Sequence, residues 1–101
     1  MGKVDISFAA SAVSDLEEIR IWYADQDVPD VGKRLIGEIF QWIETLETHP
    51  ELGRIVSEFD QPYLRELIQA PFRIIYRRDP GKVRIVRIWR SERLIRLPDE
   101  L

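Results

Sequence analysis

The chain has 101 residues, of which 45% are hydrophobic and 33% are charged, and its formal net charge is −3. This composition is too apolar for a disordered segment and too charged for a membrane protein, and no apolar run approaches the roughly 20 residues that a membrane-spanning helix needs. The first residues lack the hydrophobic core of a signal peptide, and the absence of cysteine excludes disulfide and thiolate chemistry. We therefore expect one domain over residues 1–101, located in the cytoplasm.

The small net charge conceals an asymmetry between two halves. Residues 1–53 carry 4 Lys/Arg and 11 Asp/Glu, a net charge of −7, whereas residues 54–101 carry 11 and 7, a net charge of +4. All cations of the second half except Lys82 are arginines, which suit bidentate contacts with carboxylates and phosphates. The second half is therefore the expected contact surface for an acidic partner. The alternative interpretation is a solvated sheet edge.

The N-terminal part predicts a strand and then a helix. Val4, Ile6 and Phe8 alternate with polar residues, which is the period of a strand. Apolar residues three and four positions apart then predict a helix over residues 11–24. Asp15 falls in its early turns, where the positive end of the helix dipole favours a carboxylate.

A second helix is expected over residues 29–46. Asp27 offers a capping oxygen before it, Pro29 suits its first turn, and Pro50 lies beyond its end. Because the connection between the two helices is short, we expect them to form an antiparallel hairpin.

The C-terminal half changes to the two-residue period of strands. Strands are expected over residues 63–68, 72–77 and 83–89, with turns at residues 70–71 and 78–82. The predicted fold class is α+β: a helical hairpin packed on a small, mainly antiparallel sheet, in the order strand, helix, helix, strand, strand, strand.

Both faces of the predicted sheet carry apolar side chains. In the last strand, Val83, Ile85 and Trp89 fall on one face, and Val86 and Ile88 fall on the other. Two helices cover only one face, so the other is expected to expose an apolar strip flanked by arginines, a pattern typical of interaction surfaces. The alternative is that sheet curl and the aliphatic C-terminal tail cover this strip.

Four local strings follow one another along the chain. They are Ala12-x-x-Asp15-Leu16-x-x-Ile19-x-x-x-Tyr23; Leu46, Pro50 and Gly53-Arg54; Arg65-Glu66-Leu67 before Phe72-Arg73-Ile74-Ile75-Tyr76-Arg77; and Val83-x-Ile85-x-x-Ile88-Trp89 before Arg90-Ser91-Glu92-Arg93. Each alone is largely core pattern. In this order and spacing, from Val4 to Arg93, the combination resembles the ParE/RelE superfamily of type II toxin–antitoxin toxins.

The resemblance implies a toxin that is held inactive by an antitoxin, whose extended C-terminal part wraps the toxin's sheet and helices. ParE-like members poison DNA gyrase, whereas RelE-like members cleave messenger RNA in the ribosome with a basic cluster in place of a metal or a histidine. The outline, including Asp15-Leu16 and Arg65-Glu66-Leu67, is more similar to the ParE branch. One departure is that many relatives have a histidine where this chain has Arg90.

The basic cluster of RelE-like members is matched only in part. Arg73 and Arg93 correspond to its two arginines, Arg65 is the only cation where lysines are expected, and no tyrosine follows Arg93. Arginine stays protonated and is therefore a poor general base. The favoured prediction is a non-enzymatic, ParE-like toxin that inhibits DNA gyrase by protein binding. The alternatives are a metal-independent, ribosome-dependent mRNA endonuclease that uses Arg65, Arg73 and Arg93, and a repurposed member that only binds its partner.

The expected partner-binding residues are Arg65, Arg73, Arg77, Trp89, Arg90 and Arg93. The expected partners are a cognate antitoxin and DNA gyrase, or the ribosome and mRNA in the alternative, and no membrane. A homodimer and a toxin–antitoxin hetero-oligomer both remain open. The sequence has no metal motif, phosphate-binding glycine loop or nucleophile–histidine arrangement, so neither a cofactor nor a metal is expected.

Overall fold

The computed structural model describes residues 2–90 as one α+β unit with seven elements. Their bounds are β1 (Asp5–Phe8), α1 (Ala10–Asp25), α2 (Pro29–Thr45), β2 (Arg54–Ile55), β3 (Leu64–Gln69), β4 (Phe72–Asp79) and β5 (Lys82–Arg90). The predicted fold class, the helical hairpin and the three long strands are confirmed. The two-residue strand β2 was not predicted, because it is too short to show a period. Within the described residues, no helix has the length and apolarity needed to cross a membrane.

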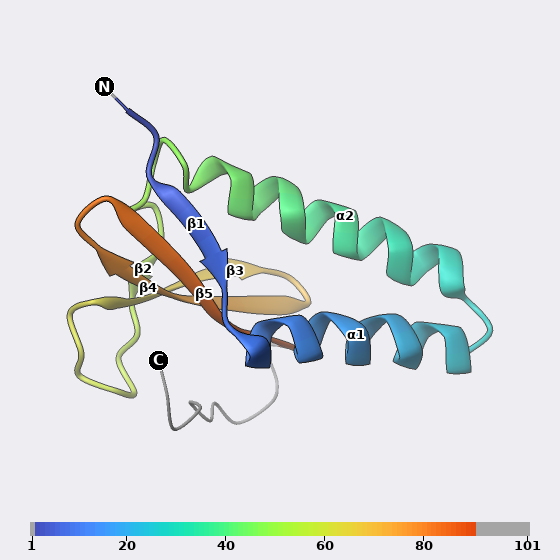
Figure 1. The fold of residues 1–101 in the computed structure, drawn as a ribbon. Coiled ribbons are helices and arrows are strands. Elements are labelled where there is room, and N and C mark those ends of the chain that lie inside the picture. Colours follow the sequence, from blue (N-terminus) through green and yellow to red (C-terminus); the bar gives the residue numbers. More distant parts are fainter. Residues whose placement is uncertain (1, 91–101) are drawn as a thin grey trace.

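The sheet has the strand order β1-β5-β4-β3-β2, and the two helices lie together on one of its faces (Figure 1). Neighbouring strands from β5 to β2 are antiparallel, while β1 pairs with β5 in parallel. The β4–β5 turn uses Gly81 at a φ of 73°, a left-handed conformation that glycine adopts without steric cost. The sheet is therefore mainly antiparallel, as expected, with one parallel edge.

The principal core lies between the helices and the sheet. Ile19 of α1 and Ile39 and Ile43 of α2 pack with the strand residues Ile74 and Ile85, all of them buried. The two helices approach closely where Gly32 of α2 meets α1, since a Cβ at this position would lie 2.8 Å from the Cβ of Tyr23. Helical amphipathicity thus places the hairpin, and a glycine sets its spacing.

A β-bulge in β5 reverses the predicted faces of its C-terminal half. Tyr76 pairs with Ile85 but Ile75 pairs with Arg87, so Val86 is an extra residue opposite no single partner. Beyond it, Ile88 joins the helix-side core and Trp89 lies on the opposite face. The expectation that Trp89 shares a face with Ile85 is wrong, because strict alternation does not survive a bulge.

Helix α1 covers the edge of β5 that β1 leaves unpaired. The hydroxyl of Ser11 donates to the carbonyl of Val86 at 2.7 Å, and the carboxylate of Asp15 accepts from the backbone N–H of Ile88 at 2.9 Å. Asp15 also accepts two 2.8 Å hydrogen bonds from Arg87 and is only 3% exposed. Asp15 lies in the early turns of α1, as predicted, but its main role was not foreseen: it is a buried substitute for a strand partner.

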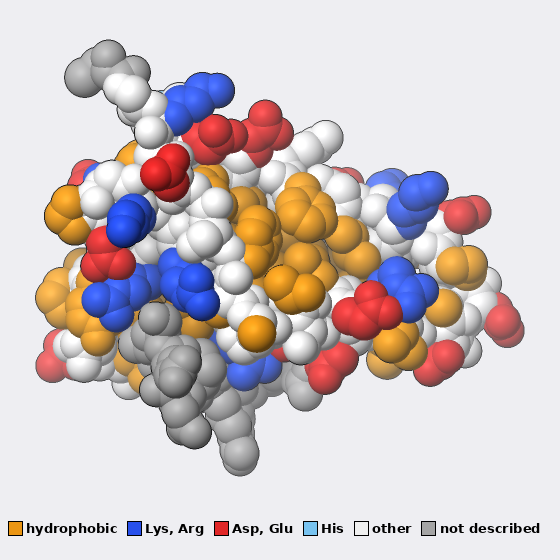
Figure 2. All heavy atoms as spheres, in the orientation of Figure 1, with side chains coloured by type: hydrophobic (Ala, Val, Ile, Leu, Met, Phe, Trp, Pro, Cys, Tyr) orange, Lys and Arg blue, Asp and Glu red, His pale blue; other side chains and the backbone are white. Residues whose placement is uncertain are grey.

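The helix-free face of the sheet is also covered within the described chain. Val56, Leu64, Ile75 and Trp89 form a second buried cluster, with Phe59 and Tyr63 packed against it. The expected exposed apolar strip is therefore not observed, because the connection between β2 and β3 folds over it. Exposed apolar side chains instead gather mostly on the side of the helices, where Figure 2 shows a broad apolar area over α2 and the neighbouring β1. Large exposed apolar residues of the helices include Val13 (54% exposed) and Phe40 (45% exposed).

The loops before and after α2 are each held in a way that the sequence did not predict. Asp27 does not cap α2: the capping position is Val28, no side chain caps the helix, and Asp27 itself has a φ of 62°. Gly53 packs so tightly beneath β4 that a Cβ there would lie 2.7 Å from the hydroxyl of Tyr76. That hydroxyl accepts from the Gly53 N–H at 2.9 Å and donates to the Pro50 carbonyl at 2.8 Å. Tyr76 therefore ties the loop after α2 to the sheet.

Candidate functional site: the arginine face

Five arginines project from the helix-free face of the sheet, which we call the arginine face. They are Arg54 of β2, Arg73 and Arg77 of β4, and Arg84 and Arg87 of β5. The register places them together, because directly paired residues share a face: Arg54 pairs with Glu66, Arg73 with Ile68, Arg77 with Arg84, and Arg87 with Ile75.

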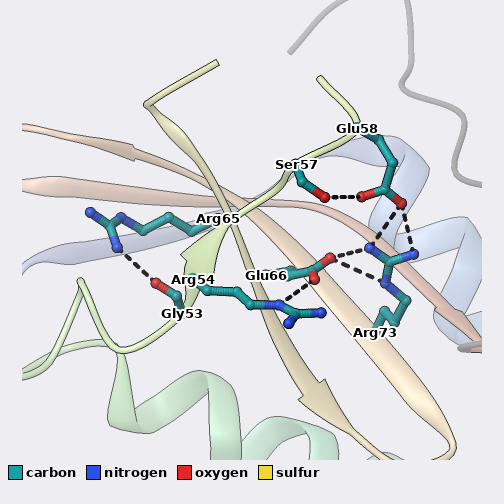
Figure 3. A network of polar contacts seen from close by, with 7 residues as sticks. All are labelled: Gly53, Arg54, Ser57, Glu58, Arg65, Glu66 and Arg73. Carbon is teal, nitrogen blue, oxygen red and sulfur yellow. Dashed lines mark hydrogen bonds and ion pairs between the residues drawn. The ribbon is translucent and has the colours of Figure 1, made fainter. Parts of the chain in front are cut away.

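Glu66 organises one end of the arginine face (Figure 3). Its side chain is 2% exposed and accepts from Arg54 Nε at 2.8 Å and from Arg73 Nε at 3.1 Å, with a further ion pair to the Arg73 terminal nitrogen. Glu58, on the β2–β3 connection, accepts from both terminal nitrogens of Arg73 at 3.3 Å. Two guanidinium groups and two carboxylates thus form a charge-compensated network.

The network perturbs the ionisation of its members. Burial lowers the pKa of Arg73, but its hydrogen bonds to Glu66 and Glu58 outweigh this and raise the pKa above the ordinary value. Burial raises the pKa of Glu58, but the hydrogen bonds from Arg73 lower it below the ordinary value. Arg73 is 11% exposed and permanently charged, so an incoming phosphate would have to displace carboxylates already in place.

The two described arginines of the predicted RNase cluster do not meet. Arg65 pairs with Tyr76, whose side chain lies in the helix-side core, while Arg73 lies on the arginine face. Figure 3 shows the two side chains directed away from each other. Arg65 donates to the carbonyls of Gly53 at 2.7 Å and Glu51 at 3.3 Å, so it braces the loop after α2.

On strands β4 and β5 of the arginine face, two cations lie over aromatic rings. Arg87 lies over the Trp89 ring at 4.2 Å while binding Asp15, and Arg77 lies over the Tyr63 ring at 4.5 Å. Stacking of this kind covers apolar surface with a charged group. Trp89 is only 5% exposed, so its contact with a partner stays a prediction that would require Arg87 to move from the ring.

The comparisons with known proteins bear on this geometry. Residues 6–95 match the family model described as the ParE toxin of the type II toxin–antitoxin system parDE. The chain belongs to the ParE toxin family. No curated protein matches the sequence.

Solved structures of toxin–antitoxin systems share the fold of this ParE family member. One is the chromosomal ParDE system of P. aeruginosa, with a TM-score of 0.74 and 22% identity over 89% of this chain and 98% of that chain. Another is the RelBE2 complex of Mycobacterium tuberculosis, with a TM-score of 0.62 and 17% identity over 88% and 99%. At these identities the likeness concerns the fold, which both branches of the superfamily share.

The last two predicted site residues lie at or beyond the end of β5. Arg90 donates to the Tyr23 hydroxyl at 3.1 Å and lies 5.3 Å from the centre of the Trp22 ring. Arg90, Tyr23 and Trp22 line a hollow of about 160 Å³ between α1 and the ends of β4 and β5. Phe72 also lines this hollow. Arg93 lies outside the described residues.

Three residues of the arginine face were missed by sequence reasoning. Glu66 and Arg54 were quoted only as parts of family strings, and Arg84 was not singled out. The buried carboxylate of Glu66 could not be inferred locally, since its partners are 12 and 7 residues away. Arg84 could have been found from hairpin symmetry, because the turn at residues 78–82 places it opposite Arg77.

Proposed function

We propose that this ParE family member is the toxin of a type II toxin–antitoxin pair, that it inhibits DNA gyrase by protein binding, and that a cognate antitoxin neutralises it. Membership of the ParE family favours this target over the ribosome. The observation that carries the choice is the placement of Arg65 and Arg73 on opposite faces of the sheet.

This placement argues against the endonuclease alternative on chemical grounds. Cleavage of RNA needs groups that bind the scissile phosphate, stabilise its developing charge and move protons. Arg73 is instead held by two carboxylates, and Arg65 donates to backbone carbonyls. Gyrase inhibition by binding needs no such constellation, only a surface complementary to the enzyme.

The antitoxin is proposed to engage the arginine face through acidic side chains. Solved relatives with this fold are toxin–antitoxin complexes, and the arginine face presents planar guanidinium groups suited to carboxylates. The predicted contacts Arg73, Arg77, Arg90 and Arg93 remain proposals, as does Trp89. Arg65 has a structural role in the described chain, and its contact with a partner is the least favoured of the six.

The decisive experiment measures both targets side by side. The full chain is induced in cells without antitoxin, while purified protein is added to gyrase with relaxed plasmid. Gyrase inhibition predicts loss of supercoiling with intact transcripts, and co-expression of the antitoxin should restore growth. Primer extension that finds cuts at ribosomal A-site codons, with supercoiling unaffected, would refute the gyrase assignment in favour of the endonuclease. Unimpaired growth without antitoxin would refute both.

A further inference from the structure

Two cations stand directly opposite each other in the sheet. Arg77 of β4 and Arg84 of β5 are cross-strand partners, so their Cβ atoms are about 4.5–5.5 Å apart on the arginine face. Like charges at such positions destabilise a sheet, because each raises the electrostatic cost of the other. A pair of this kind calls for a compensating anion.

The described chain compensates only one of the two. Arg77 Nε donates to the Asp79 carboxylate at 2.8 Å, which raises the pKa of Arg77, and its guanidinium lies over the Tyr63 ring. Arg84 makes no hydrogen bond, ion pair or ring contact with any residue of the part that the structure describes. One guanidinium is therefore held in position beside another that has no polar partner among residues 2–90.

The surroundings keep the positive charge in excess. Residues 77–84 contain four Lys/Arg and one Asp/Glu, a net charge of +3. Lys82 lies on the same face as Arg77 and Arg84, whereas Arg78 pairs with Val83 on the helix side. Figure 2 shows Lys and Arg side chains gathered around this end of the sheet. Asp79 provides the single carboxylate of this segment, and its cross-strand neighbour is a further cation, Lys82.

We propose that Arg77 and Arg84 form a carboxylate-binding subsite that takes an acidic side chain of an extended peptide segment. The planar guanidinium groups provide parallel N–H donors that match a carboxylate bidentately. In the context of the proposed function, this peptide belongs to the antitoxin.

Charge along the rest of the face selects a peptide over a nucleic acid. Affinity for nucleic acid comes from many successive phosphate contacts. Further along the arginine face, however, the arginines are already occupied by the carboxylates of Glu58, Glu66 and Asp15, which would repel a continuous phosphate backbone. A single carboxylate needs only the Arg77–Arg84 pair, and neither of these arginines is bound by Glu58, Glu66 or Asp15.

Arg84→Ala separates a binding role from a structural one. Because the substitution removes like-charge repulsion and breaks no hydrogen bond or ion pair of the described residues, the melting temperature should stay unchanged or rise. Binding of the full chain to its antitoxin, and to a synthetic peptide of alternating Glu and Thr, should weaken by about tenfold or more. A peptide with Gln in place of Glu should not bind. Arg84→Lys, which keeps the charge but loses the planar fork, should weaken binding less than Arg84→Ala.

Arg20→Ala is the matched control, since it removes one positive charge from an exposed position on α1. It should leave both affinities unchanged. The proposal is overturned if Arg84→Ala lowers the melting temperature by several degrees, if it binds peptide like the wild type, or if a DNA or RNA oligonucleotide of equal charge binds more tightly than the Glu peptide. Failure of the wild-type chain to bind any antitoxin would refute the proposed function, whereas the peptide measurements decide the subsite independently.

Discussion

Replacing Asp15 should be among the most damaging single changes to this fold. Its carboxylate, with a side chain 4% exposed, accepts from two nitrogens of Arg87 and from the N–H of Ile88. Asp15→Ala removes a buried carboxylate from a partly buried guanidinium and leaves a buried N–H without an acceptor. Breaking a buried pair in this way costs about 3–5 kcal/mol. A domain of this size is stable by only about 5–15 kcal/mol, so much of its free energy of unfolding would be lost.

Urea denaturation followed by circular dichroism tests this expectation. With a slope of about 2 kcal/mol per M, a loss of about 4 kcal/mol shifts the midpoint by about 2 M. Asp15→Asn should cost less, because the amide oxygen still accepts from Ile88 while the charge is lost. Glu18→Ala, an exposed acidic position one turn later in α1, should change stability by less than about 0.5 kcal/mol. Equal effects of Asp15→Ala and Glu18→Ala would refute the edge-covering role.

Three further predictions concern stability. Gly32→Ala should destabilise the fold by about 1–3 kcal/mol in urea titrations, because its Cβ would force α1 and α2 apart. Gly37→Ala, which has open space around it, should stabilise the fold by about 0.5–1 kcal/mol. A change of the same sign in both variants would contradict the close approach of the helices. Tyr76→Phe should cost about 1–3 kcal/mol by leaving two backbone groups of the loop after α2 unpaired, and an unchanged midpoint would remove this tether. Because the folded-state pKa of Glu58 is lowered, its pairing with Arg73 stabilises the fold at pH values above the ordinary glutamate pKa. This contribution disappears as the pH falls through the lowered value. The difference in the free energy of unfolding between wild type and Glu58→Gln, at most about 0.5 kcal/mol because Glu58 is exposed, should therefore vanish in acid.

Local periodicity was sufficient to predict most elements of the fold. Within each helix, the spacing of apolar residues indicates which face is buried, and Ile19 of α1 and Ile39 and Ile43 of α2 lie on these faces. This inference requires no knowledge of the rest of the chain. Strand β2 was not predicted because two residues show no period. The bulge at Val86 was not predicted because a bulge is defined by the pairing with the partner strand.

The candidate site was predictable in composition but not in connectivity. The arginine-rich strands followed from composition and the two-residue period. Whether an arginine is paired depends on carboxylates such as Glu66, which arrive from distant positions through the register. Arg65 and Arg73 were therefore grouped by family resemblance although the sheet separates them.

From its sequence alone, this protein is determined to be an α+β domain with an acidic helical hairpin and an arginine-rich sheet, because burial and charge patterns repeat over a few neighbouring residues. Only the tertiary structure decided that Asp15 closes the edge of β5, that the β2–β3 connection covers the second sheet face, and that Arg84 faces Arg77. These features depend on which groups meet after the chain has folded back on itself. A local pattern records the preference of a residue, whereas its partners are set by long-range register and packing.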